Sequence, residues 1–433
     1  NLIFNIFDEY NLMNDTQHTL NADDSEPTSF LKIISNKQFR LLWLIGGFAS
    51  CMRWLDMLIL GVYTFEITNS AFLVGLIFFY RQIPRLIFGT FIGIISDRFN
   101  RKYILFFTFA ILWVIYAVIA YLIHVEKISY TVLAITMFLA GICWAHEFPV
   151  RRAMIGDVIP NNIAGKAFGI DIGTSAFTRI IGPALGGAIL SFLGPVSGYL
   201  TVAISFLIVS ILCLGVKVTN QNIYKNEHGK KISGFIDDTK EAIRYIKNNN
   251  LLQGTIMVTF AMNLFAFPYF NMVPVVGKEI LQANPFQVGL MGAIEGTGAL
   301  IGASIIATKV NYNNYARVYF FGSLFLTLCI FLFANSSIYF LSMAILFICG
   351  FGMVSFATMQ TTLTIVSSDP EIRGRTMGAL SIAIGAGPLG SLLIGILASQ
   401  FGTQNGLMII ATLCFTSMLI IGYFWPVIRK NVE

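Results

Sequence analysis

Residues 93–102 read GIISDRFNRK and set one acidic and three basic residues at the junction of two long apolar segments, 72–95 and 103–123. Each segment, as a helix, is long enough to cross about 30 Å of hydrocarbon. A short charged loop between two such segments is typical of a polytopic membrane protein, because charged side chains hold the loop at the aqueous surface.

The composition of the whole chain agrees with this interpretation. Charged residues make up 12% of the chain and apolar types 56%, whereas charged residues are roughly a quarter of ordinary soluble domains. The net charge of +6 lies in short loops beside apolar segments, which indicates membrane topology and not nucleic-acid binding. The six cysteines fall in apolar stretches without metal-ligand spacing, so we interpret them as packing residues and expect no metal and no cofactor.

Twelve apolar segments are predicted to span the membrane. They lie at 41–65, 72–95, 103–123, 130–150, 167–192, 196–216, 252–276, 286–307, 315–334, 338–363, 377–399 and 407–427. The sequence thus predicts a polar cytoplasmic tail over 1–38, mostly disordered, a six-helix bundle over 39–216, a linker over 217–251, a second bundle over 252–427 and a short tail over 428–433. Within the linker, residues 235–246 have the pattern of an amphipathic helix that lies on the membrane surface.

The basic residues of the short loops predict the orientation. Those on the linker's side are Arg98, Arg101, Lys102, Arg151, Arg152, Lys166, Lys309, Arg317, Arg373, Arg375, Arg429 and Lys430. The opposite loops hold little more than Lys127 and Lys278. The positive-inside rule therefore predicts that both termini are cytoplasmic.

The two predicted bundles resemble each other in sequence. Residues 69–76, NSAFLVGL, are echoed by 284–290, NPFQVGL, and residues 182–186, GPALG, by 387–390, GPLG. Both echoes keep the same direction through the membrane. They predict an all-α membrane protein of twelve transmembrane helices in two parallel six-helix repeats.

The segment 93–102 resembles the G-x-x-x-D-R-x-[GN]-R-[RK] motif of the major facilitator superfamily. The resemblance implies the major facilitator fold and a gating role for Gly93, Asp97, Arg98 and Arg101, with Asp97 acting as a latch against the eleventh span. The equivalent loop of the second half, 309–314, has no acidic residue, so the latch would act from one half only. The alternative is a loop without a gating role, in which the basic residues serve only to hold it on the cytoplasmic side.

Two further segments narrow the resemblance. Gly182 and Pro183, followed by Gly186 and Gly187, resemble the G-P-x-x-G-G element of facilitator antiporters, and simple helix packing explains the same pattern. Residues 148–160 and 370–375 are similar to the enterobactin-exporter and macrolide-efflux branch. The resemblance covers residues 39–427 and implies a transporter, with weak information on its substrate.

Four charged residues are predicted near the middle of the membrane: Arg53, Arg81, Arg179 and Glu295. Such charges are costly in hydrocarbon unless they are paired or hydrated, and they usually face a cavity. Asp56 lies one turn from Arg53 and can pair with it. The set carries more positive than negative charge, which favours an anionic or carboxylate-bearing substrate bound by the three arginines. The alternative is that Arg53 forms a structural pair with Asp56, and that Arg179 pairs with Glu295 or with another residue.

Other polar residues are predicted to act in gating, proton coupling and substrate binding. Glu147 and Arg151 form a same-face pair nearer the cytoplasm, with Asp171 at a similar depth, and are predicted to be gate ion pairs. Proton coupling needs a carboxylate that can change its charge in a poorly hydrated place. The residues predicted for it are Glu295, Asp56 and Asp171. Arg85 lies one turn from Arg81 on the same face. In the second half, the predicted substrate ligands are Asn263 and Gln360. The rest of that half is predicted to form an apolar wall with an aromatic cluster of Phe265, Phe267, Tyr269 and Phe270.

The leading hypothesis is a proton-coupled exporter of a small amphipathic or anionic molecule in a bacterial inner membrane, working as a monomer by alternating access. Its expected partners are the substrate, the lipid bilayer and protons. An importer or lysophospholipid transporter of the same fold is the alternative. An intramembrane enzyme is disfavoured because His146-Glu147 lacks the second histidine that a zinc site needs, and a transport-inactive sensor is disfavoured by the retained midplane charges.

Overall fold

The computed structural model describes residues 30–217, 241 and 243–430 of the 433, without the side chains of 30–32, 89–98 and 161–162. The predicted N-terminal tail over 1–38 and the predicted amphipathic helix over 235–246 therefore lie largely outside the described residues. Within the described ranges, every regular element is helical.

The first bundle begins with the short helix α2 and continues with four long helices and one very long one. Their bounds are α2 Phe30–Ser35, α3 Lys37–Thr68, α4 Ala71–Arg98, α5 Arg101–His124, α6 Tyr130–Val158 and α7 Asn161–Leu214. The second bundle comprises α9 Asn250–Ala261, a π-helical turn Met262–Ala266, α10 Tyr269–Glu279, α11 Pro285–Lys309, α12 Tyr315–Asn335, α13 Tyr339–Val366, α14 Arg373–Ile384, α15 Gly387–Phe401 and α16 Thr403–Phe424.

Eleven described helical stretches are long and apolar enough to cross a membrane. One of them, α7, has 54 residues, which at about 1.5 Å per residue is more than twice the thickness of the hydrocarbon core. Gly194, with φ 79°, and Pro195 interrupt it, so α7 contains two spans. The prediction of an all-α membrane fold of about twelve helices is confirmed.

Capping residues at the short loops begin and end several of these helices. Asn100 begins α5 by accepting a hydrogen bond from the Lys102 amide at 3.0 Å, and Asn284 begins α11 with a reciprocal capping box to Gln287. Asn69 ends α3 in the left-handed conformation, with φ 49°. Such caps satisfy amides that the helices leave without partners, so sharp reversals between spans are possible.

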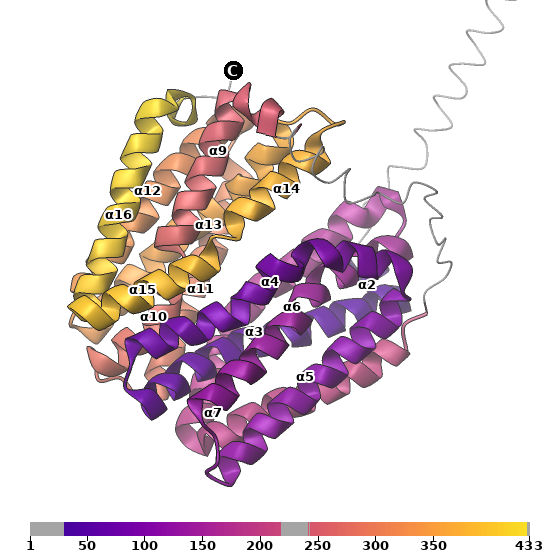
Figure 1. Cartoon of the computed structure of the whole chain (residues 1–433). Helices are drawn as coiled ribbons and strands as arrows, with labels where there is room; N and C mark the ends of the chain where they lie inside the picture. Colours follow the sequence, from indigo (N-terminus) through magenta and orange to yellow (C-terminus); the bar gives the residue numbers. More distant parts are fainter. Residues whose placement is uncertain (1–29, 218–240, 242, 431–433) are drawn as a thin grey trace, which may run out of the picture.

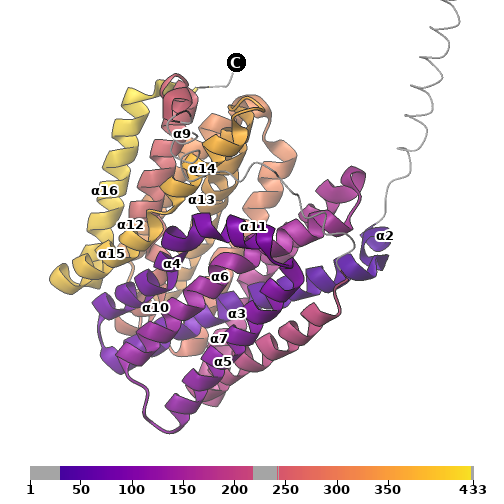
Figure 2. The same cartoon turned by 45° about the vertical axis from the view of Figure 1, so that its right-hand side comes forward.

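The two bundles converge at one end and diverge at the other, as Figures 1 and 2 show. At the converging end, α4 packs against α15 and α7 packs against α11. The diverging ends carry the start of α9 and the end of α16 (Figure 1).

Both inter-bundle contacts are built on glycines. A Cβ atom at Gly75 would lie 2.6 Å from the carbonyl oxygen of Ser391, and one at Gly187 would lie 2.6 Å from that of Pro285. The contacts involve the two pairs of segments that echo each other in sequence, so they are related by the internal repeat. Because no side chain separates the backbones, the helices approach very closely at this end.

Candidate functional site

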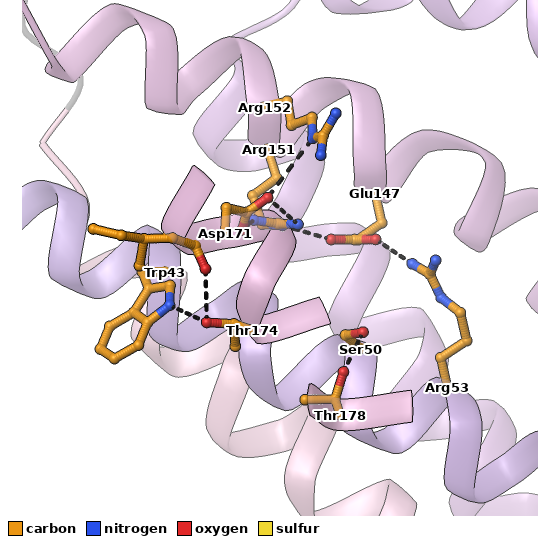
Figure 3. Close-up of polar contacts among 10 residues, drawn as sticks. Trp43, Ser50, Arg53, Glu147, Arg151, Arg152, Asp171, Thr174 and Thr178 are labelled. Atoms are coloured by element: carbon orange, nitrogen blue, oxygen red, sulfur yellow. Dashed lines mark hydrogen bonds and ion pairs between the residues drawn. The ribbon is translucent and has the colours of Figure 1, made fainter. Parts of the chain in front are cut away.

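A chain of ion pairs crosses the first bundle and joins α3, α6 and α7 (Figure 3). Glu147 accepts from Arg53 at 2.5 Å through one oxygen and from Arg151 at 2.8 Å through the other. Arg151 also donates to Asp171 at 2.5 Å. The Arg53 side chain is 31% exposed, whereas those of Glu147, Arg151 and Asp171 are 1–2% exposed.

The same helices are held together by hydrogen bonds beside this chain. Trp43 donates to Thr174 at 2.7 Å, and the hydroxyls of Ser50 and Thr178 lie 2.7 Å apart, each linking α3 to α7 (Figure 3). The prediction that Glu147 and Arg151 pair is confirmed, and Asp171 joins them. Whether they act as a gate stays a prediction.

Asp56 forms a second buried cluster with Arg81 of α4 and with the hydroxyl of Tyr116, which donates to it at 2.7 Å. The prediction that Asp56 pairs with Arg53 is wrong. Although these two residues lie one turn apart on α3, Arg53 reaches Glu147 of α6 and Asp56 reaches Arg81 of α4. For these two residues, the neighbouring helices α6 and α4 supply the partners.

A third ion pair joins the two bundles. Arg179 of α7 donates to both carboxylate oxygens of Glu295 of α11, at 2.7 and 2.9 Å. Tyr269 of α10 donates to Glu295 at 3.1 Å. The Arg179 guanidinium lies 5.0 Å from the ring centre of Trp54 and 5.8 Å from that of Phe270, so aromatic faces from both bundles flank it.

The structure describes both predicted substrate ligands of the second half. Asn263 lies in the π-helical turn, is buried and donates to the carbonyl of Thr259 at 2.9 Å. The side-chain oxygen of Gln360 is buried and has no hydrogen-bond partner among the described residues. Neither residue is hydrogen-bonded to the three arginines in the described part of the chain, so their role as substrate ligands stays a prediction.

The predicted gating loop is described only in part. Gly93, Asp97 and Arg98 belong to α4 but lie in the range 89–98, whose side chains the structure does not describe. Arg101 forms an ion pair with Asp157 at 2.7 Å, which ties the start of α5 to the end of α6. The latch predicted for Asp97 therefore stays a prediction.

Gly182 and Pro183 lie in packed parts of α7. A Cβ at Gly182 would lie 2.6 Å from Cβ of Trp54, and one at Gly292 of α11 would lie 3.0 Å from Cβ of Pro183. Gly182 thus permits close packing within the first bundle, and Pro183 contributes to the contact between the bundles. This agrees with the packing interpretation of the motif and leaves its antiporter role untested.

Two features were missed from the sequence. Lys278 and Glu66, from different bundles, form an ion pair at 2.9 Å, and Tyr269 is a hydrogen-bond donor to Glu295 and not only part of an aromatic wall. The sequence carried no signal for either of these two contacts. Within the described ranges, no group of three potential metal-ligating side chains comes together.

Comparisons with known proteins agree with this architecture. The model of the Major Facilitator Superfamily matches residues 42–389 and 315–433. The staphyloferrin A transporter of Staphylococcus aureus is 24% identical over 371 residues, which are 84% of this chain and 91% of the relative. Macrolide efflux protein A of Streptococcus pyogenes is 23% identical over 368 residues, 81% of this chain and 87% of the relative.

Solved structures share the fold. A bacterial homologue of the human lysosomal transporter Spinster matches with a TM-score of 0.72 and 13% identity over 92% of this chain and 99% of that chain. The D-xylose-proton symporter matches with a TM-score of 0.67 and 15% identity over 91% and 99%. The predicted resemblance to a siderophore and macrolide-efflux branch is confirmed, and the chain is an integral membrane transporter and not an enzyme. Matched by the family model over most of its length, the chain belongs to the major facilitator superfamily.

Proposed function

We propose that this transporter is a proton-coupled exporter of a small amphipathic or anionic molecule, located in the bacterial inner membrane with both termini in the cytoplasm. In this orientation the diverging ends of the bundles face the cytoplasm, and the glycine contacts close the extracellular side. Alternating access then consists of rocking the two bundles so that these contacts open and the cytoplasmic ends approach.

The observation that carries the proposal is the ion pair between Arg179 and Glu295, because it joins the two bundles at the inner end of the extracellular contact. Opening that contact draws α7 away from α11 and separates the pair. A separated buried pair costs about 3–5 kcal/mol, because each charge loses its partner. A proton on Glu295 removes one of these charges and therefore favours the outward-open state.

This arrangement supports coupling in a defined order. Glu295 takes up a proton when it faces the outside, and on return to the inward-open state it pairs with Arg179 and releases the proton to the cytoplasm. On the outward stroke, the free energy of substrate binding between the bundles offsets the cost of separating the pair. Proton entry would thus drive substrate exit.

The relatives support the direction and the substrate class. One is named a macrolide efflux protein and another a staphyloferrin A transporter. Arg53 of the first bundle is partly exposed, which is consistent with an anionic group on the substrate. The arrangement of twelve helices is also that of a D-xylose-proton symporter, so an importer or lysophospholipid transporter remains the alternative.

The test is transport in reconstituted vesicles with an imposed pH gradient, using siderophores, macrolides and lysolipids as candidate substrates. We expect the wild-type protein to move a substrate against the direction of proton flow. We expect Glu295→Gln to retain exchange of substrate without a gradient and to lose the gradient-driven component. Substrate movement with the protons would establish the importer, and gradient-driven flux that is unchanged in Glu295→Gln would refute the role of the pair.

Arg81→Ala is the comparison variant. It removes a buried arginine whose carboxylate partner lies within the same bundle, so we expect loss of folded protein and not a selective loss of coupling. A folded Arg81→Ala protein with the same selective loss as Glu295→Gln would show that the contact between bundles is not what sets the coupling.

A further inference from the structure

Arg53 and Arg85 occupy the same level of the first bundle. The Asp56–Arg81 pair aligns α3 with α4, because it joins one residue from each helix. The two helices run in opposite directions. The turn of α3 that precedes Asp56 therefore lies beside the turn of α4 that follows Arg81. These turns carry Arg53 and Arg85, and Arg85 acts electrostatically on Arg53.

Arg85 lies at the edge of the face of α4 that borders the second bundle. On α4, Gln82 donates to Ser391 of α15 at 3.4 Å, and Leu86 lies 2.5 Å from the Cβ position of Gly385. This face of α4 therefore borders the second bundle, and Arg85, which follows Arg81 by one turn, lies between that face and α3. Arg85 is exposed and, among the residues that the structure describes, has no ion pair or hydrogen bond.

An arginine without a carboxylate in the middle of a membrane protein is expensive unless water or a ligand compensates its charge. The like charges of Arg53 and Arg85 also repel each other, so an anion bound beside both would lower this cost. Arg53 is further held by the ring of Trp144, whose centre is 4.5 Å from the guanidinium carbon. This contact fixes the plane of the guanidinium while its N–H groups stay available at the edge.

The carboxylate partners of Arg53, Arg81 and Arg179 differ in the contacts that each would keep if its arginine moved away. If Arg53 leaves, Glu147 keeps its bond to Arg151 at 2.8 Å. If Arg81 leaves, the hydroxyl of Tyr116 is the one hydrogen-bond partner that Asp56 keeps among the described residues.

The same comparison applies to the pair between the bundles. If Arg179 leaves, Glu295 keeps one hydrogen-bond partner within the described ranges, the hydroxyl of Tyr269. Buried carboxylates that lose their only cation are strongly destabilised. Arg53 is therefore the paired arginine best able to exchange its partner for a substrate, and it is also the most exposed of the three, at 31% against 6% and 15%.

We propose that Arg53 and Arg85 form the site that binds the carboxylate groups of the transported substrate, whereas Arg81 and Arg179 keep their internal partners during binding. The inference rests on the proposed transport function and assigns the substrate to carboxylate-bearing molecules. It also separates the substrate site, in the first bundle, from the coupling pair of Arg179 and Glu295 between the bundles.

Binding of isophthalate, a rigid dicarboxylate, to the purified full-length transporter tests the site without any gradient. Isophthalamide, its uncharged diamide, and inorganic phosphate are the comparison ligands. We expect isophthalate to bind and the diamide not to bind. We expect Arg85→Gln and Arg53→Gln each to weaken isophthalate binding by about tenfold or more, the effect of losing one charge-assisted hydrogen bond.

Arg152→Gln is the matched control, because it removes the same charge from the same bundle at a side chain that is 32% exposed and lies 3.7 Å from Asp171. Its affinity for isophthalate should change by less than about twofold. Arg85→Glu would supply Arg53 with a carboxylate opposite it. We expect this variant to lose isophthalate binding and to melt at a temperature no lower than the wild-type protein.

The inference is overturned if wild-type protein does not bind isophthalate, if it binds the diamide or phosphate equally well, or if a folded Arg85→Gln protein binds isophthalate with wild-type affinity. These outcomes differ from a failure of the proposed function. If the proposed function alone is wrong, isophthalate binding will still depend on Arg53 and Arg85, but vesicles will show no flux that responds to a pH gradient.

Discussion

Gly187→Ala is expected to shift the transporter away from the conformation described here. The added Cβ would lie 2.6 Å from the carbonyl oxygen of Pro285 and 2.9 Å from Cα of Gly289. Both are backbone atoms, which cannot move aside as the end of a flexible side chain can. The helices α7 and α11 must therefore separate at the converging end.

The size of the effect follows from this overlap. Adding one carbon to a tightly packed contact costs about 1–3 kcal/mol, which corresponds to a population shift of about five- to 150-fold. The cost falls only on the state in which α7 and α11 are in contact. The substitution therefore favours the opposite state and leaves the packing within each bundle unchanged.

The shift can be measured as a distance between the diverging ends. Tyr103, near the start of α5, and Tyr312, between α11 and α12, are exposed at those ends and are suitable for Tyr103→Cys and Tyr312→Cys spin labels. In Gly187→Ala, the population with a short distance between the labels should increase. Gly173→Ala on the same helix is the control, because a Cβ there would have no atom within 4 Å.

Two results would refute the reasoning. One is an unchanged distance distribution in folded Gly187→Ala protein. The other is an equal shift in Gly173→Ala, since that change could act only through the intrinsic preferences of α7. The repeat provides a second check, because Gly75→Ala in the related contact should shift the distances in the same direction.

Three further substitutions have expected outcomes. Asp56→Asn leaves Arg81 buried without its carboxylate and should lower the melting temperature strongly, and replacing both residues with similarly sized uncharged ones should recover part of the loss if the stranded charge is the cause. Gly46→Ala places a Cβ 2.5 Å from the guanidinium carbon of Arg151, so it should break the ion pairs of that arginine and reduce the melting temperature more than an alanine at Gly169, which has free space around it. Asn284→Ala removes the capping box of α11 and should cost about 1 kcal/mol in unfolding measurements, while a serine there should cost less.

Much of the architecture was predictable from the sequence because the bilayer imposes it. Segments that cross hydrocarbon must be long and apolar, and charged loops must stay in water. The structure contains these helices and differs from the prediction in two places. The π-helical turn Met262–Ala266 and the break between α14 and α15 interrupt segments that were predicted as single spans. The interruption of α7 at Gly194 agrees with the predicted boundary between the spans 167–192 and 196–216.

The partners of the charged residues were predictable only in part. Glu147 and Arg151 pair as their spacing on one helix indicates. Asp56 does not pair with Arg53, although their spacing is equally suitable, because Arg81 of another helix reaches it. Helical spacing states which residues share a face, but it does not state which neighbouring helix that face meets.

By itself, the sequence determined that this chain is a membrane protein of two like-oriented six-helix halves with ionisable groups in its interior, since hydropathy, loop charge and the internal repeat follow directly from residue identities. Only the tertiary structure decided that Arg179 and Glu295 connect the halves, that Glu147 has two arginines and Arg85 no carboxylate partner among the described residues, and that glycine contacts hold one end together. The physical reason is that an ion pair forms only where charged atoms from different helices lie within about 4 Å of each other. Those distances are set by the packing of the bundles, in which residues more than a hundred positions apart become neighbours.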